Sequence, residues 1–217
     1  MRKLLLSIFL VSWFIIPGYG QLMKTVKIDS VVTVSLPPAF QKKDTLGQQR
    51  FTGNALYGYM IVIRSANDKN NTPLKKERDL KKVLKDYINN IKAQSPGSSI
   101  IHLRDTVAGT LEAKTFTLKN DDGNGNVQLI DFTVIYTQDA TYTFEYAYPG
   151  NRSELIKDEY KSFISSIRFG PQLQRNDQYL SNVKVLSPLA KTGIYGGGAV
   201  LIALIVIFIV RKKKLAV

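Results

Sequence analysis

The chain has 217 residues and contains no cysteine, which excludes disulfides, thiolate metal sites and thiol nucleophiles. Its formal net charge is +13, of which Arg2, Lys3 and the four cations at 211–214 contribute six and the rest of the chain contributes +7. For an exported chain, a basic surface favours anionic lipid or another anionic envelope component over nucleic acid. Both ends are too apolar for a water-soluble core, so about 150 residues remain, enough for one domain.

The first 20 residues have the order of regions that is typical of a secretory signal peptide. Arg2 and Lys3 precede an uncharged run at 4–16 that is apolar apart from two serines, and small residues follow up to Gly20. The run is too short to cross a hydrocarbon core about 30 Å thick, which argues against an uncleaved anchor helix. We therefore expect residues 1–20 to be a signal peptide, cleaved after Gly20.

The segment 24–63 is expected to form three strands. The first ends at Leu36, before two prolines that cannot donate hydrogen bonds in a ladder. Two further strands follow, with a turn near Gly53 and Asn54. The last of them carries apolar side chains on both faces, so we expect it to be central in a sheet.

A helix is predicted to begin at Pro73, where the missing amide hydrogen costs nothing. Apolar residues then repeat at spacings of three and four, which is the pattern of an amphipathic helix: Leu80, Val83, Leu84, Tyr87, Ile88 and Ile91. Four cations lie on one flank of the same helix: Lys75, Arg78, Lys82 and Lys85. Such a stripe is usually a solvated face, but it is also a candidate contact for anionic headgroups or an acidic partner protein.

Four more strands and a second helix complete the expected domain. The strands are predicted at 100–105, 111–118, 127–136 and 141–148, and the helix begins near Asn151. Short connections between consecutive strands favour antiparallel pairing. The prediction is an α+β domain over 21–169, with an antiparallel sheet of about six or seven strands packed with two main helices.

This order of elements, together with "VTVSLPPAF" early and "YKSFISSIRF" late, resembles the PsbP-like fold, named for an extrinsic protein of the photosynthetic oxygen-evolving complex. The resemblance covers about 24–169. It implies a class whose members are mostly non-catalytic and assemble with, stabilise or regulate other proteins. No residue-level motif of the family is matched, so the resemblance assigns no functional residue.

The C-terminal end is predicted to hold the protein in the cytoplasmic (inner) membrane. After an expected linker at 170–191, no charge interrupts 192–210, and a helix of this length spans about 28 Å, enough to cross a bilayer. Four cations follow directly: Arg211, Lys212, Lys213 and Lys214. Because basic flanks remain on the cytoplasmic side, the tail at 211–217 is expected inside and the domain outside.

An alternative for this end is a cell-wall sorting signal. The residues "LAKTG" at 189–193 resemble the sortase motif, whose usual form has proline in place of Ala190, and an apolar segment and a basic tail follow as in that family. A sortase would cut between Thr192 and Gly193 and transfer the protein to the wall. The signal peptide resembles those of double-membrane bacteria, which usually lack this pathway, so we favour permanent anchoring.

Groups that suit catalysis are few. The single histidine, His102, cannot build a multi-histidine metal site, and it is expected to be an ordinary strand residue that shares a face with Ile100 and Arg104. An enzyme would depend on carboxylates, so the alternative function is a carboxylate-dependent envelope hydrolase. The carboxylates on predicted strands are Asp105, Glu112, Asp131 and Glu145.

The loop "NDDGNGNV" has the alternate oxygen ligands that open a calcium loop, at Asp122, Asn124 and Asn126. However, Val127 stands where such a loop requires glycine, and Thr133 replaces its glutamate. A hairpin turn is therefore expected. The chain is predicted to use no metal, cofactor or catalytic residue, and to act as a binding or assembly module whose partners are the lipid bilayer and another envelope protein or anionic envelope component.

Overall fold

The computed structural model describes residues 23–180, apart from 46, 69–72 and 122. The predicted signal peptide, membrane helix, sorting motif and basic tail lie outside the described residues. Within them, no helix is both long enough and apolar enough to cross a membrane.

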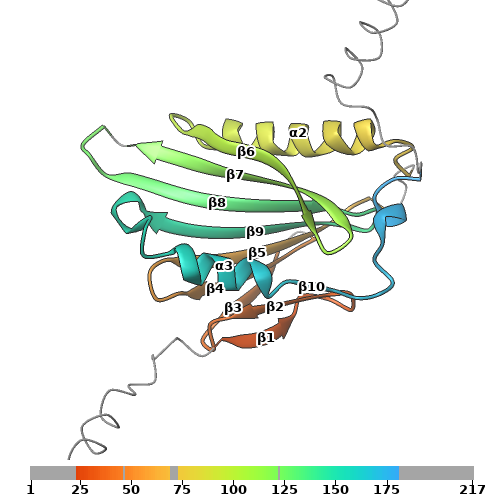
Figure 1. Cartoon of the computed structure of the whole chain (residues 1–217), viewed down its shortest axis with the longest axis horizontal. Coiled ribbons are helices and arrows are strands. Elements are labelled where there is room, and N and C mark those ends of the chain that lie inside the picture. The colour runs from red at the N-terminus through yellow and green to blue at the C-terminus, as the bar shows by residue number, and fades with distance from the viewer. Residues whose placement is uncertain (1–22, 46, 69–72, 122, 181–217) are drawn as a thin grey trace, which may run out of the picture.

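Two antiparallel sheets form the domain (Figure 1). The larger has seven strands in the order β3-β4-β5-β9-β8-β7-β6, with bounds β3 (Gln41–Thr45), β4 (Gln48–Asn54), β5 (Tyr59–Ala66), β6 (Ser99–Ala108), β7 (Leu111–Asp121), β8 (Val127–Tyr136) and β9 (Ala140–Pro149). The smaller consists of β1 (Lys24–Lys27), β2 (Val32–Leu36) and β10 (Arg168–Phe169). The α+β prediction is confirmed, and β5 is central as expected, between β4 and β9. The segment predicted to form three strands instead forms five, of which β1 and β2 belong to the small sheet.

Helix α2 (Glu77–Ala93) covers one face of the large sheet, and α3 (Lys157–Ser165) and the small sheet cover the other (Figure 1). Helix α2 begins four residues after Pro73, because the amide of Lys76 donates to the Asp79 carboxylate at 3.0 Å and caps the first turn there. Near Asn151 the chain forms the short 3₁₀ turn η1 (Gly150–Arg152), and α3 begins only at Lys157.

The two faces of the large sheet hold separate cores. Under α2, the rings of Phe116 and Phe132 stack at 4.6 Å between centroids, and the predicted stripe of the helix packs on them through Leu80, Leu84 and Ile88. On the opposite face, β2, α3 and the aromatic side of β9 form the second core. The alternation of aromatic residues along β9 predicts one buried and one solvated face. The aromatic face is buried, at Tyr142, Phe144, Tyr146 and Tyr148, but the opposite face is covered as well, since Thr141 and Thr143 are 7% and 1% exposed.

The domain extends beyond Phe169, so the predicted linker at 170–191 is wrong for its first part. The turn η2 (Arg175–Asp177) precedes Gln178 and Tyr179, which are 2% and 1% exposed. The side-chain amide of Gln178 donates to the carbonyls of Glu112 and Tyr136 at 2.7 and 2.9 Å. These hydrogen bonds fix a polar segment that by composition is typical of a linker.

Candidate functional site: the groove between β6 and α3

Strand β6 is an edge of the large sheet, and a β-bulge interrupts it. The pairing register with β7 shifts between Ile101 and Arg104. Within the bulge, His102 has a positive φ of 55°. Among the described residues, it is the one non-glycine residue with a positive φ. A side chain held in this region costs about 1 kcal/mol or more, and such bulges redirect side chains.

The bulge overturns the prediction for the face that His102 occupies. Ile100 lies against the core under α2, whereas Arg104 donates through Nε to Thr115 Oγ1 at 3.0 Å on the opposite face. The extra residue moves the side chains that follow it to the other side of the sheet. His102 and Arg104 both line a cleft on the α3 side.

A chain of polar contacts runs from the bulge into this cleft. His102 Nδ1 lies 3.5 Å from Thr117 Oγ1, and that hydroxyl donates to Asp131 Oδ1 at 2.5 Å. Burial raises the pKa of the Tyr148 hydroxyl, and the nearby negative charge of Asp131 raises it further. The pKa of Tyr160 is raised for the same two reasons. Both tyrosines therefore stay protonated, and the Tyr148 hydroxyl is hydrogen-bonded to Asp131.

The cleft has a volume of about 300 Å³, and basic side chains from both of its walls line it. Arg104 comes from β6, and Lys157 from the first turn of α3, where it also contacts the exposed Glu154. The carboxylate of Asp131 already accepts from Thr117. Two cations and several hydroxyl groups suit the binding of an anionic or hydroxyl-rich group.

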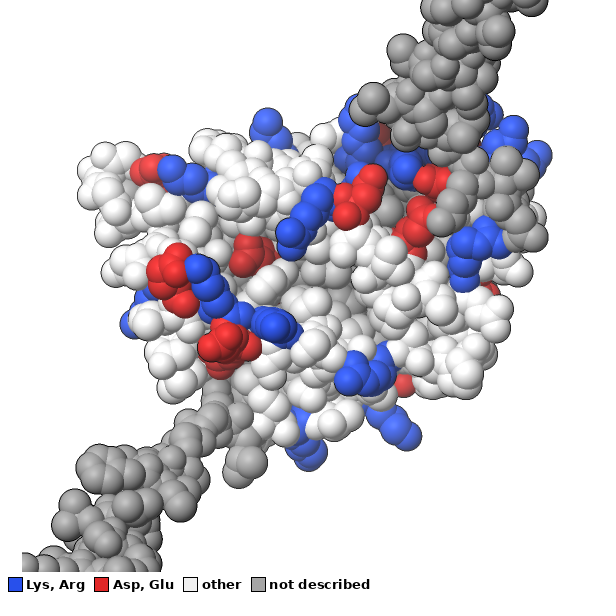
Figure 2. Space-filling model, viewed as in Figure 1, with Lys and Arg blue, Asp and Glu red and all other residues white. Residues whose placement is uncertain are grey.

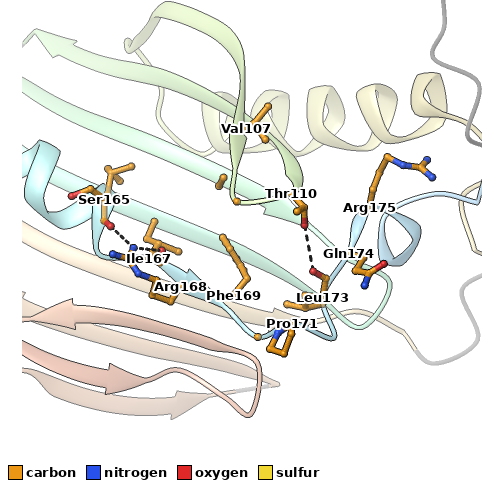
Figure 3. A pocket seen from close by; sticks show the side chains of 14 residues that line it. Val107, Thr110, Ser165, Ile167, Arg168, Phe169, Pro171, Leu173, Gln174 and Arg175 are labelled. Atoms are coloured by element: carbon orange, nitrogen blue, oxygen red, sulfur yellow. Dashed lines mark hydrogen bonds between the residues drawn. The ribbon is translucent and has the colours of Figure 1, made fainter.

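A second cleft of about 770 Å³ continues along the same strand and helix toward the β6–β7 turn (Figure 3). Its walls carry Val107 and Thr110 on one side and Arg168 and Phe169 on the other, and Thr110 Oγ1 donates to the carbonyl of Leu173 at 3.4 Å (Figure 3). The β6–β7 turn passes close to the ring of Phe169: a Cβ added to Gly109 would lie 3.3 Å from it. Gly109 also has a positive φ of 62°. We call the two clefts together the β6–α3 groove.

None of the cations predicted as an anionic contact lies in this groove. Lys75, Arg78, Lys82 and Lys85 are exposed on α2 or just before it, on the other face of the large sheet. Their role as a contact stays a prediction. The groove cations were missed because their proximity depends on the pairing of β6 and the position of α3.

The four candidate carboxylates are divided between the two faces. Asp131 lies in the groove. Glu145 lies on the face of β9 that is opposite to its aromatic side. Asp105 and Glu112, with Glu77, line a cleft of about 250 Å³ between α2 and the β6–β7 hairpin. Asp105 contacts Lys114, and Glu112 accepts from the Tyr179 hydroxyl at 2.6 Å. Of the four candidates, the structure therefore brings only Asp105 and Glu112 together in one cleft.

The loop at 122–126 connects β7 and β8 as the predicted hairpin. Gly123 and Gly125 both have positive φ, at 76° and 86°, which explains the glycines of this turn. In the described residues, no group of three or more acidic or histidine side chains is placed to hold a metal ion.

Comparison with known proteins identifies the fold. No family model matches the sequence, and no curated protein matches it. The solution structure of cyanobacterial PsbP (CyanoP) from Synechocystis sp. PCC 6803 is similar to 70% of this chain and 95% of its own, with a TM-score of 0.50 and 16% identity. A crystal structure from Bacteroides thetaiotaomicron VPI-5482 matches 65% of this chain and 46% of its own, with a TM-score of 0.37 and 12% identity. The first similarity confirms the PsbP-like fold and, at this identity, shows the fold alone.

The strain at the bulge predicts that His102→Gly stabilises the domain. Glycine adopts φ 55° without a steric cost, so the free energy of unfolding should rise by about 1 kcal/mol in urea titration. Leu103→Gly in the same bulge is the matched control and should not stabilise, because Leu103 has no positive φ to relieve. An equal rise in both variants would show that the strain at His102 is not the cause.

Proposed function

We propose that this chain is a non-catalytic binding module of the bacterial cell envelope, tethered to the outer side of the cytoplasmic membrane by its C-terminal apolar segment. In this proposal the β6–α3 groove holds an anionic component of the envelope, such as an acidic segment of another envelope protein. The groove carries the proposal, because a strained bulge there presents Arg104 and His102 toward Lys157 across a cleft.

The chemistry of the groove supports binding over catalysis. Its hydroxyl groups and cations are hydrogen-bond donors, and its one carboxylate, Asp131, is already hydrogen-bonded. A hydrolase of the paired-carboxylate type needs two acidic groups on either side of a scissile bond. The groove offers one, so its donors suit the recognition of a partner better than bond cleavage.

The two ends of the sequence support the placement in the envelope. A signal-peptide pattern at 1–20 directs export, and the apolar run at 192–210 with its four following cations is suited to a membrane anchor whose tail stays in the cytoplasm. Retention of this segment, without cleavage after Thr192, is part of the proposal.

Photo-crosslinking from the groove tests the binding proposal. A benzophenone amino acid replaces Val107, which is 64% exposed and lines the second cleft of the groove, in the full chain in its native membrane. We expect a discrete adduct from this position and none from Thr45 on β3, the opposite edge of the sheet. The double variant Arg104→Glu with Lys157→Glu should reduce the adduct by about tenfold, since each interface cation contributes up to about 1 kcal/mol.

The matched control is Lys42→Glu with Lys43→Glu, which makes the same change of charge on β3. This control should leave the adduct unchanged. An adduct that is insensitive to reversal of Arg104 and Lys157, or one that falls equally in the control, would rule out the groove as the binding site.

A further inference from the structure

The described chain ends beside the first turn of α2. The amide of Leu180 donates to the carbonyl of Leu74 at 2.9 Å. Tyr179 is buried at this point, and its hydroxyl donates to Glu112. These contacts place Leu180 at the end of the domain where α2 begins, opposite to the β7–β8 turn (Figure 1).

Basic side chains gather at this exit. Figure 2 shows several Lys and Arg side chains close to where the described C-terminal end leaves the domain, with Asp and Glu side chains among them. We name the α2 basic end after four exposed residues there: Lys75, Lys76, Arg78 and Lys82. Three of them belong to the stripe that the sequence predicted as an anionic contact, and the structure now places this stripe beside the exit.

The acidic residues of the same turn are directed to intramolecular partners. Glu77 is 6% exposed and pairs with Lys81 at 2.6 Å. The Asp79 carboxylate accepts the amide of Lys76 at 3.0 Å and lies 3.5 Å from Arg78 Nε, whose side chain remains 69% exposed. The surface that faces outward is therefore positive, and the exposed Leu180 adds an apolar side chain, 59% exposed, next to it.

The length of chain that follows limits the distance between this surface and the proposed anchor. Eleven residues, 181–191, separate Leu180 from the uncharged run that starts at Thr192. Fully extended they reach at most about 40 Å, and as a flexible chain they span roughly 20 Å. The exit end of the domain therefore stays close to the membrane, which raises its effective concentration at the lipid surface.

We infer that the α2 basic end binds the anionic headgroups of the bilayer in which the chain is anchored. This inference rests on the membrane anchor of the proposed function. It orients the domain with the start of α2 toward the lipid and with the β4–β5 and β7–β8 turns, at the opposite end of the strands, away from it. A cation held within a Debye length of an anionic surface is attracted, whereas the same cation at the far end, several times further away, is screened.

Energy transfer to labelled lipid tests the orientation in the full chain, reconstituted in nanodiscs. The chain has no cysteine, so a donor dye is attached at Asn176→Cys, near the exit, or at the exposed Leu56→Cys in the β4–β5 turn, at the opposite end of the strands, and the acceptor is on the headgroups. In discs with phosphatidylglycerol we expect much stronger transfer from the exit label than from the Leu56 label. In zwitterionic phosphatidylcholine discs this difference should shrink.

Charge reversal supplies the decisive comparison. The triple variant Lys75→Glu, Arg78→Glu, Lys82→Glu should lower the ratio of docked to undocked domains by roughly a hundredfold, because each cation near an anionic surface contributes about 1 kcal/mol. The matched control reverses three basic residues at the opposite end of the domain, Lys92, Lys119 and Arg152, and should leave the transfer unchanged. Equal transfer from both labels in anionic discs, or no effect of the triple variant, would overturn the inference.

Two further outcomes separate this inference from the proposed function. A chain that resists carbonate extraction and floats with the lipid, but transfers equally from both labels, keeps its anchor and loses only the docking surface. A chain that does not float overturns the anchor and, with it, this inference. A difference between labels that is the same in anionic and zwitterionic discs would also contradict lipid binding and would point to a protein partner.

Discussion

Asp29→Ala is expected to lower the free energy of unfolding by about 3–5 kcal/mol, the largest effect that we predict for a single polar residue of this domain. The Asp29 carboxylate joins the turn between β1 and β2 to the large sheet. Oδ1 accepts the amides of Val31 and Val32, both at 2.9 Å. Oδ2 accepts Arg64 Nε at 2.7 Å and the Tyr142 hydroxyl at 2.6 Å.

Alanine at position 29 would leave the Arg64 charge, whose side chain is 23% exposed, without its carboxylate. It would also leave three neutral donors to find other partners. Urea unfolding of residues 21–180, followed by circular dichroism, measures the loss. The control is Asp44→Ala, which removes an exposed 3.5 Å contact with Lys42 and should change stability by less than about 0.5 kcal/mol. Equal losses in the two variants would contradict this role of Asp29.

The pH dependence of the Asp29 effect follows from its hydrogen bonds. Burial by itself raises the pKa of this carboxyl, but the hydrogen bonds from Tyr142, the Val31 amide and Arg64 outweigh burial and lower the pKa below 3.8. A group with a lowered folded-state pKa stabilises the protein above its unfolded-state pKa and loses this contribution as pH falls through the folded value. The difference between wild type and Asp29→Ala should therefore shrink below about pH 4.

Glu145→Gln is expected to make the domain more stable at pH 8 by about 2–3 kcal/mol and to have little effect at pH 4.5. Glu145 lies between Ile61 and Phe132 on the neighbouring strands. Burial raises its pKa from 4.5 to about 7, and the charge of Arg50 only partly opposes this. The folded state then holds a proton that the unfolded chain releases, so wild-type stability should fall as pH rises from 4.5 to 7.

Glutamine removes this titration while it keeps the size and polarity of the side chain. Urea unfolding of wild type and variant at several values between pH 4.5 and 8 measures the divergence. Glu154→Gln is the control, because the side chain of Glu154 is 80% exposed and a change there should give parallel curves. A constant difference between Glu145→Gln and wild type across this range would show that Glu145 does not carry the titration.

The periodicity of the sequence was enough to predict the existence of both helices and strands β6 to β9, but not the five strands before α2 or their division between two sheets. Buried residues recur at a fixed spacing in the stripe of α2 from Leu80 to Ile88 and on the aromatic side of β9. Such a spacing can be recognised within one helix or one strand, without knowledge of its neighbours. The similarity to CyanoP agrees with that architecture.

What the sequence could not predict depends on contacts between distant segments. A run such as "IIHLRDT" is typical of a regular strand, and the bulge at His102 becomes evident only from the pairing of β6 with β7. The polar stretch after Phe169 lacks an apolar pattern, yet Gln178 fixes it through the backbone of β7 and β8. The groove results from both the bulge and the position of α3, so its cations could not be grouped in advance.

Taken together, the groove and the α2 basic end assign different roles to opposite faces of the large sheet. One face carries α3 and the proposed partner site, and the other carries α2, whose first turn lies at the exit toward the proposed anchor. Both roles require that the domain is exported and that the C-terminal tail is not.

Labelling of single cysteines in spheroplasts tests that requirement directly, because the natural chain contains none. One full-length variant carries Asn124→Cys in the β7–β8 turn and another carries Lys213→Cys in the basic tail. With a membrane-impermeant maleimide, we predict labelling of Asn124→Cys in intact spheroplasts and labelling of Lys213→Cys only after permeabilisation. Protection of Asn124→Cys in intact spheroplasts, while an exported control protein is labelled, would contradict the account.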